Sequence, residues 1–385
     1  MSEKIELIDT HAHAHLLRTY HGTDENGVEI INDERRRFLN DFMSQSGPEI
    51  VTKVIQIPIN FPQNMDWHDN DLRSVFCSKR KDGEGVFRDR LLDENGKSIP
   101  GFYMAQGLHP KFVHQILYKD FIYINDAAVR KTPSGMEDLV DKKELKERER
   151  FVQSGIEEQI KNHKDVVAIG ETGFEFYYDF EKRVCDHPAY QEKWFRWHIR
   201  LAKKYDLPLI IHLRSGARRE QNANKKAIDI LKDMKAKGIL REKNPGVIHC
   251  FIGNKTEARE FHRIGFVLGI GASFTYGDPE NCEVLKSSGG NVRPEFQVKH
   301  YRKLYEVVRD IPLEWIVLET DAPYLPLKDN SGYRENTSLA IPQIAKKIVE
   351  AKNKAAAEKG VSEITLKDVA EITTENALRV FPGIR

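Results

Sequence analysis

The fold is decided by three neighbouring stretches: DVVAIG at residues 165–170, PAYQEKWFRWHIRLAKKY at 188–205 and PLIIHL at 208–213. The first and third are short, near-continuous apolar runs, which are typical of parallel strands buried on both faces. The middle stretch opens at Pro188 and repeats its apolar residues with the period of a helix. Together they predict one strand–helix–strand unit.

The same alternation continues outward in both directions. Eight strands are predicted, at residues 5–9, 51–59, 102–108, 165–170, 208–213, 246–251, 266–271 and 315–320. A closing helix is predicted over 366–381, with Thr365 as its N-cap and Asp368 three residues later. Eight such units favour a closed barrel over a doubly wound sheet. We therefore predict an α/β protein with a (β/α)₈ TIM barrel.

One barrel domain is expected to fill residues 1–385, with insertions in the loops after strands 2, 3 and 7. The insertions occupy about 61–101, 113–163 and 275–300. The first contains a turn sequence at 93–96 and the third a flexible SSGG loop at 287–290. The charged run at 142–150 in the second predicts a solvated helix face. In a barrel, insertions after strands lie on the catalytic face.

The composition bounds the class of protein. Hydrophobic residues make up 40% of the 385, enough for a large core, and 60 basic residues nearly balance 59 acidic ones. That balance favours a catalytic pocket over a protein that coats nucleic acid nonspecifically. No apolar run approaches the ~18 residues that cross a membrane. The four cysteines form no CxxC pair and no signal region opens the chain, so we expect a cytoplasmic protein.

Histidines and carboxylates stand where the predicted strands end. The first strand runs into Asp9-Thr10-His11-Ala12-His13. Strand residues two apart point the same way, so His11 and His13 can reach into one site. Glu171 directly follows the apolar run of strand four, where a buried charge needs a partner or a metal ion.

Three further strands end in the same way. His212 ends strand five, His249 ends strand six, and Asp321 follows strand eight. Each histidine alone is more often a satisfied core residue than a ligand. In a barrel, however, these ends converge on one pocket. Four histidines and two carboxylates suffice for two divalent ions with open positions. This ligand set suits Zn²⁺, Mn²⁺ or Ni²⁺ better than Mg²⁺, which prefers more oxygen.

The motifs resemble the TatD family of metal-dependent deoxyribonucleases, within the amidohydrolase-like superfamily. The matching stretches are DTHAH at 9–13, GLHP at 107–110, GETGFE at 170–175, IIHLR at 210–214, IHCF at 248–251, ETDAPYL at 319–325 and TTENALRVF at 373–381. The resemblance covers nearly the whole chain outside the insertions. The sequence departs from the family pattern at His15, where the family often has an acid, and at Glu175, where it has Asp.

The resemblance implies a role for each matching residue. The implied metal ligands are His11 and His13 for one ion, His212 and His249 for a second, Glu171 between the two, and Asp321 on the first ion. The implied catalytic residues are Asp321, which orients the nucleophilic water, Glu171, and His109 beside the scissile phosphate. The implied substrate-binding residues are Arg214, Glu175 and Tyr324. The cofactors would be two divalent ions, with Zn²⁺, Mn²⁺, Mg²⁺ and Ni²⁺ all open.

The expected function is a nuclease of the 3′–5′ exonuclease type, in which metal-activated water cleaves phosphodiester bonds. Its partner is then a nucleic acid, DNA more than RNA. The basic segment 214–219, with Lys225 and Lys226, is a candidate contact for the nucleic-acid backbone, and a basic surface loop is the competing interpretation.

Two other functions stay open. A metal-dependent acyl or amide hydrolase, such as a D-aminoacyl-tRNA deacylase, needs the same metal, water and base. A metal-binding subunit of a larger assembly would use the insertions at 61–101 and 113–163 to dock its partners. The sequence leaves the oligomeric state open.

Overall fold

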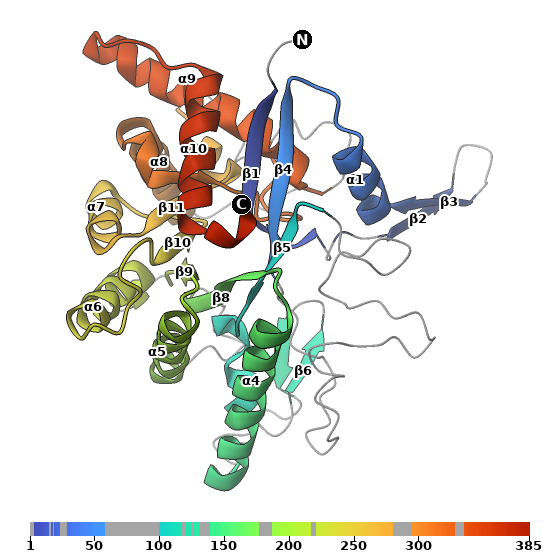
Figure 1. Cartoon of the computed structure of the whole chain (residues 1–385), viewed down its shortest axis with the longest axis vertical. Coiled ribbons are helices and arrows are strands. Elements are labelled where there is room, and N and C mark those ends of the chain that lie inside the picture. Colours follow the sequence, from blue (N-terminus) through green and yellow to red (C-terminus); the bar gives the residue numbers. More distant parts are fainter. Residues whose placement is uncertain are drawn as a thin grey trace. The chain divides into compact units, whose positions relative to one another are not determined.

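The structure is a computed structural model of the chain, drawn in Figure 1. It describes residues 4–14, 17, 19–23, 29–57, 100–117, 121–124, 127–130, 139–176, 187–216, 221–279, 295–327 and 335–385. The predicted turn at 93–96 and loop at 287–290 lie outside these residues.

Eight strands make up the main sheet in chain order, and every described pairing between them is parallel. They are β1 (Ile5–Ala12), β4 (Glu49–Gln56), β5 (Phe102–Gln106), β8 (Val166–Glu175), β9 (Leu209–Arg214), β10 (Gly246–His249), β11 (Val267–Ile270) and β12 (Ile316–Leu318). All eight predicted strands are therefore confirmed, and with them the α/β class and the (β/α)₈ barrel.

The chain divides into two compact units. The first comprises Met1–Gln56, Pro100–Tyr103 and Val247–Arg385, and the second comprises Ile57–Ile99 and Met104–Gly246. A single barrel domain over 1–385, with insertions after strands 2, 3 and 7, stays a prediction.

In the first unit, β1 pairs with β4, and β11 pairs with both β10 and β12. An isolated parallel bridge joins Ala12, at the end of β1, to Ala322, beyond the end of β12. The helices of this unit are α1 (Glu34–Met43), α7 (Lys255–Ile264), α8 (Glu295–Asp310), α9 (Ile341–Lys359) and α10 (Leu366–Val380). Helix α10 packs against β1 and β12, so the closing helix covers the strands whose ends carry His11 and Asp321.

In the second unit, β8 lies between β5 and β9. All ten residues of β8 are buried, as expected for a strand with neighbours on both edges and helices on its face. The described helices of this unit are α3 (His114–Leu117), α4 (Lys142–Asn162), α5 (Pro188–Tyr205) and α6 (Ala223–Ala236). Helix α5 begins at Pro188 as predicted, ends at a left-handed Asp206, and packs against β8 (Figure 1).

Short 3₁₀ helices complete the described elements. They are η2 (Pro110–Phe112), η5 (Ala272–Gly277), η7 (Leu313–Trp315), η8 (Ser338–Ala340) and η9 (Pro382–Ile384). No helix in the described part of the chain is long and apolar enough to cross a bilayer.

Among the described residues, two hairpins interrupt the alternation of strands and helices. One, β2 (Thr19–Thr23) with β3 (Glu29–Asp33), follows the first barrel strand, where no insertion was predicted. The other, β6 (Phe121–Ile124) with β7 (Ala127–Arg130), lies inside the predicted insertion at 113–163. Both are short and lack the long apolar runs on which the strand predictions rest.

The charged run at 142–150 forms the start of α4, as predicted, but it is not solvated throughout. Arg148 and Glu149 are buried. Glu149 accepts a hydrogen bond of 2.8 Å from the Tyr190 hydroxyl and one of 2.5 Å from the Lys193 ammonium group, both on α5. The prediction of a solvated face is therefore wrong at these two residues. The Glu149 carboxylate has its partners on α5, and Arg148 pairs with Glu144 one turn earlier on α4, so both buried charges are compensated.

Helix α10 begins with a reciprocal capping box. The Thr365 side chain accepts from the backbone N–H of Asp368 at 3.2 Å, and Asp368 accepts from the backbone N–H of Thr365 at 2.7 Å. Thr365→Ala removes one of these bonds and should lower the free energy of unfolding by about 1 kcal/mol. Urea denaturation followed by circular dichroism measures this. Ser362→Ala, which removes an exposed hydroxyl from the preceding loop, is the control, and equal stabilities for the two variants would refute the assignment.

Candidate metal centre

The end of β1 brings two imidazoles together. The Nε2 atoms of His11 and His13 lie 3.2 Å apart, and their rings meet edge to face. Both residues are buried. The arrangement follows from their spacing, because residues two apart on an extended chain point to the same side.

Asp321 lies against both rings. Its backbone is left-handed, with φ of 55°, and its N–H donates to the His11 carbonyl at 2.9 Å. This places Oδ1 of Asp321 at 3.3 Å from Nε2 of His13 and 3.6 Å from Nε2 of His11. Its side chain keeps 17% of its surface exposed, so the carboxylate remains open to solvent.

His249, at the end of β10, completes this cluster. Its ring stacks on that of His11 with centroids 3.4 Å apart, and its Nε2 lies 3.9 Å from Oδ1 of Asp321. Three imidazole nitrogens thus surround one carboxylate oxygen. Imidazole and carboxylate are the donor types that divalent transition metals bind, so the chemistry of this cluster fits such an ion.

Asp9 holds the ends of β1 and β12 together. Its carboxylate accepts from the Thr320 hydroxyl at 2.7 Å and from the backbone N–H groups of Thr320 and His11, each at 3.1 Å. Burial raises the pKa of Asp9 to about 7, although the hydrogen bonds from Thr320 and His11 act to lower it. Asp9 was assigned no role from the sequence. An acid inside a buried strand, directly before the histidines, was the available signal.

Tyr324 lies at the open side of this cluster. Its residue surface is 41% exposed, and its ring centroid is 6.2 Å from that of His13. The Asn336 amide donates to the Tyr324 carbonyl at 2.8 Å and to the Thr320 carbonyl at 2.9 Å, which fixes the backbone here. A substrate-binding role for Tyr324 is compatible with this position and stays a prediction.

The second unit contains a separate cluster around Glu171, in β8. Its Oε1 lies 2.9 Å from Nδ1 of His212 and 3.7 Å from Nε2 of His109. The two rings are 4.4 Å apart at their centroids. One donor atom from each of these residues lies within 4.8 Å of the others, a spacing that one ion can span.

The other nitrogen of each ring is also occupied. The backbone N–H of Lys111 donates to Nδ1 of His109 at 3.0 Å, so His109 carries its proton on Nε2. Nε2 of His212 lies 3.1 Å from Oε2 of Glu175. Burial acts to lower the pKa of His212, but hydrogen bonds and charges from Glu171 and Glu175 outweigh it and raise the pKa to about 8.

The two other expected substrate contacts differ in accessibility. Glu175 is buried against His212, whereas the Arg214 side chain is 48% exposed, with its guanidinium 4.0 Å from Glu175. Lys225 and Lys226, considered as contacts for a nucleic-acid backbone, form ion pairs with Asp229 at 2.6 Å and Glu192 at 2.8 Å. Residues 217–220 of the basic segment lie outside the described part of the chain.

His198, on α5, contacts residues next to the Glu171 cluster. It was not singled out from the sequence. Its Nε2 accepts from the backbone N–H of Leu108 at 3.0 Å, and its Nδ1 lies 3.1 Å from the Thr172 hydroxyl. It therefore holds the residues next to His109 and Glu171. Its signal in the sequence was only a histidine on the apolar face of a helix.

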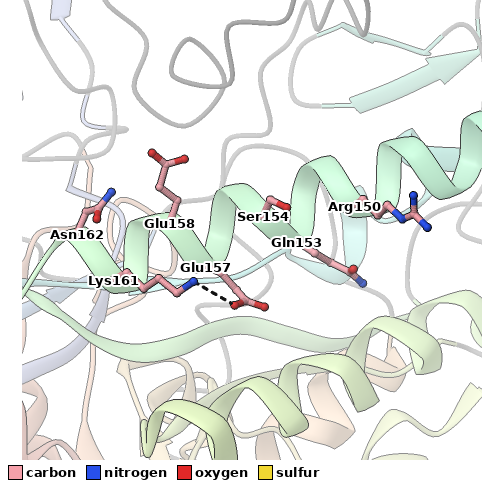
Figure 2. Close-up of a pocket in the computed structure, with 7 residues that line it drawn as sticks. All are labelled: Arg150, Gln153, Ser154, Glu157, Glu158, Lys161 and Asn162. Atoms are coloured by element: carbon pink, nitrogen blue, oxygen red, sulfur yellow. Dashed lines mark ion pairs between the residues drawn. The ribbon is translucent and has the colours of Figure 1, made fainter.

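A cavity of about 350 Å³ lies elsewhere in this unit, along α4 (Figure 2). The described residues that line it are Arg150, Gln153, Ser154, Glu157, Glu158, Lys161 and Asn162. Glu157 is already paired with Lys161 at 3.8 Å and with Lys204 at 2.6 Å. The cavity therefore lacks the histidine–carboxylate chemistry of the two clusters.

Comparison with known proteins places this geometry in context. The profile described as TatD related DNase matches residues 8–382. The chain is 31% identical over 223 residues to the uncharacterized metal-dependent hydrolase YabD of Bacillus subtilis, covering 58% of this chain and 68% of YabD. It is 28% identical over 228 residues to the human deoxyribonuclease TATDN3, covering 59% and 64%. The crystal structure of YJJV, a TatD homologue from Escherichia coli, covers 98% of both chains at a TM-score of 0.53 and 19% identity, which supports the fold.

Burial lowers the pKa of His198 from 6.5 to about 4. As the pH falls below about 6.5, this histidine binds a proton in the unfolded chain but stays neutral in the folded chain. The free energy of unfolding therefore decreases as the pH is lowered. Between pH 7 and 5 the loss should be about 2 kcal/mol. Urea denaturation at several pH values measures it. His198→Gln should reduce the dependence of the free energy of unfolding on pH. His262→Gln, at a partly exposed histidine, is the control and should keep most of this dependence. Equal pH dependence in wild type and His198→Gln would contradict the prediction.

Proposed function

Since the chain belongs to the TatD-related DNase family of metal-dependent hydrolases, we propose that it is a nuclease, a deoxyribonuclease of the 3′–5′ exonuclease type. The observation that supports this most strongly is the set of three imidazole nitrogens around Oδ1 of Asp321. The second cluster, around Glu171, offers donors for a further ion.

We propose the ligands as follows. His11, His13 and Asp321 hold one ion, His212 and His249 hold the other, and Glu171 is shared. The barrel topology supports this ligand set, because the carboxyl ends of all strands of a (β/α)₈ barrel converge on one face. Divalent ions bound there, whether Zn²⁺, Mn²⁺, Mg²⁺ or Ni²⁺, would supply the positive charge that acidifies water and stabilises a phosphate in its transition state.

The side chains divide the remaining work. The partly exposed Asp321 carboxylate takes the proton from the attacking water. His109, whose Nδ1 is occupied by the Lys111 N–H, presents its Nε2–H and so donates a hydrogen bond to a phosphate oxygen. This protonation makes His109 a substrate contact and leaves ligation to Glu171 and His212.

The exposed groups suit a nucleic-acid end. The Arg214 guanidinium can form paired hydrogen bonds with phosphate oxygens. The Tyr324 ring, exposed beside His13, offers a face on which a base can stack, a contact worth about 1–3 kcal/mol per base. The human relative is named a deoxyribonuclease, which supports DNA over RNA as the substrate.

Purified protein should cleave end-labelled single-stranded DNA when Mg²⁺ or Mn²⁺ is added, and Glu171→Ala should abolish the cleavage. A ladder shortening from the 3′ end would establish the polarity. Glu149→Ala is the matched control, since it also removes a buried carboxylate but one that binds Tyr190 and Lys193. If wild type binds metal and cleaves amide or acyl-ester substrates instead of DNA, the nuclease proposal is wrong and the acyl-hydrolase alternative replaces it.

Asp321→Asn should reduce turnover by about 10²–10⁴-fold, the usual contribution of a general base, because an amide cannot accept the proton from water. Single-turnover cleavage gives the rate, and metal analysis of the same sample gives the bound ions. The proposal expects ions retained with catalysis lost. Near-normal turnover in this variant would remove Asp321 from the role of base.

A further inference from the structure

Glu319 is a buried carboxylate that the proposed reaction does not use. It follows β12 directly and is fully buried. Its Oε1 accepts a hydrogen bond of 2.6 Å from the backbone N–H of Cys250 and lies 3.3 Å from Nδ1 of His249. The side chain therefore reaches from the end of β12 to the end of β10.

The strand between β10 and β12 leaves room for the Glu319 side chain to cross it. β11 lies between β10 and β12, and its third residue is Gly269. A Cβ atom at position 269 would overlap Oε2 of Glu319, so glycine leaves the space that the carboxylate occupies in this position. The φ of Gly269 is not in the left-handed region, so the space it leaves explains this glycine and a turn does not.

The carboxylate decides how the His249 ring is presented. Oε1 of Glu319 can accept a hydrogen bond from the Nδ1 that faces it at 3.3 Å, and such a bond places the ring proton on Nδ1. Nε2 then keeps its lone pair, and it points toward Oδ1 of Asp321 at 3.9 Å. The stacked His11 ring fixes the plane of the imidazole from one face.

We infer that Glu319 is a positioning residue for the metal centre: it fixes the tautomer and orientation of His249 so that Nε2 is offered to a divalent ion. This rests on the proposed metal site. Carboxylates that orient metal-binding histidines in this way typically contribute 10–100-fold to metal affinity.

Direct ligation by Glu319 is the competing role, since one donor atom each from His11, His249 and Glu319 lies within 4.8 Å of the others. The Cys250 contact favours the positioning role. Oε1 already accepts from the Cys250 N–H, at a residue whose backbone is left-handed with φ of 42°. The carboxylate is therefore attached to the protein beside His249.

The test measures metal affinity directly. Wild type, Glu319→Gln, Glu319→Ala and the control Glu149→Gln are titrated with Zn²⁺ against a chromophoric chelator at pH 7. Co²⁺ absorption spectra then report the number and kind of ligands. Melting temperatures of the metal-free proteins show which variants fold, and Glu319→Gln preserves the shape of the side chain if Glu319→Ala does not fold.

Glu319→Gln should weaken at least one metal-binding step about tenfold and Glu319→Ala up to about 100-fold, with the stoichiometry and the Co²⁺ spectrum unchanged. Wild-type affinity in a folded Glu319 variant overturns the inference. Loss of a whole equivalent of metal, with an altered Co²⁺ spectrum, also overturns it and makes Glu319 a ligand. Wild type that binds no ion contradicts the proposed metal site itself, which separates the two failures.

Discussion

The hydrogen bonds between Asp9 and Thr320 are the constraint on which the first cluster depends. They join two residues that are 311 positions apart in the chain, and they set the ends of β1 and β12 side by side. The backbone N–H of Asp321 then bonds to His11, which brings its carboxylate against the imidazoles. A buried carboxylate without these donors would be costly, so the strand ends and the acid stabilise one another.

Both clusters bury ionisable side chains, and one bound cation would compensate the desolvation of several of them. Buried histidines and carboxylates crowd together in each unit, and burial disfavours every charged form among them. Hydrogen bonds meet part of this cost, as at His212, where two carboxylates hold a single imidazole. A divalent cation would satisfy the remaining lone pairs of a cluster with this donor chemistry.

The sequence predicted the parts of the fold that depend on local pattern. The barrel strands are near-continuous apolar runs, and α5 and α10 begin at Pro188 and behind Thr365 as their start signals indicate. The β2–β3 hairpin was missed because its strands are short. In the site, spacing predicted the pairing of His11 with His13. The roles of His198 and Glu319 were not predicted, because each depends on a partner on another element. The role of Asp9 was missed although an acid inside a buried strand was an available signal.

The absence of a side chain at Gly269 determines which residue fits at position 319. Its contribution lies in the volume it leaves for a carboxylate that comes from a neighbouring strand. Positions 269 and 319 therefore form an epistatic pair. A side chain at 269 would force the Glu319 carboxylate out of its present position beside His249, and a shorter residue at 319 would release the constraint on 269. In related chains, a change at one position should therefore favour a change at the other, even though neither is a proposed ligand.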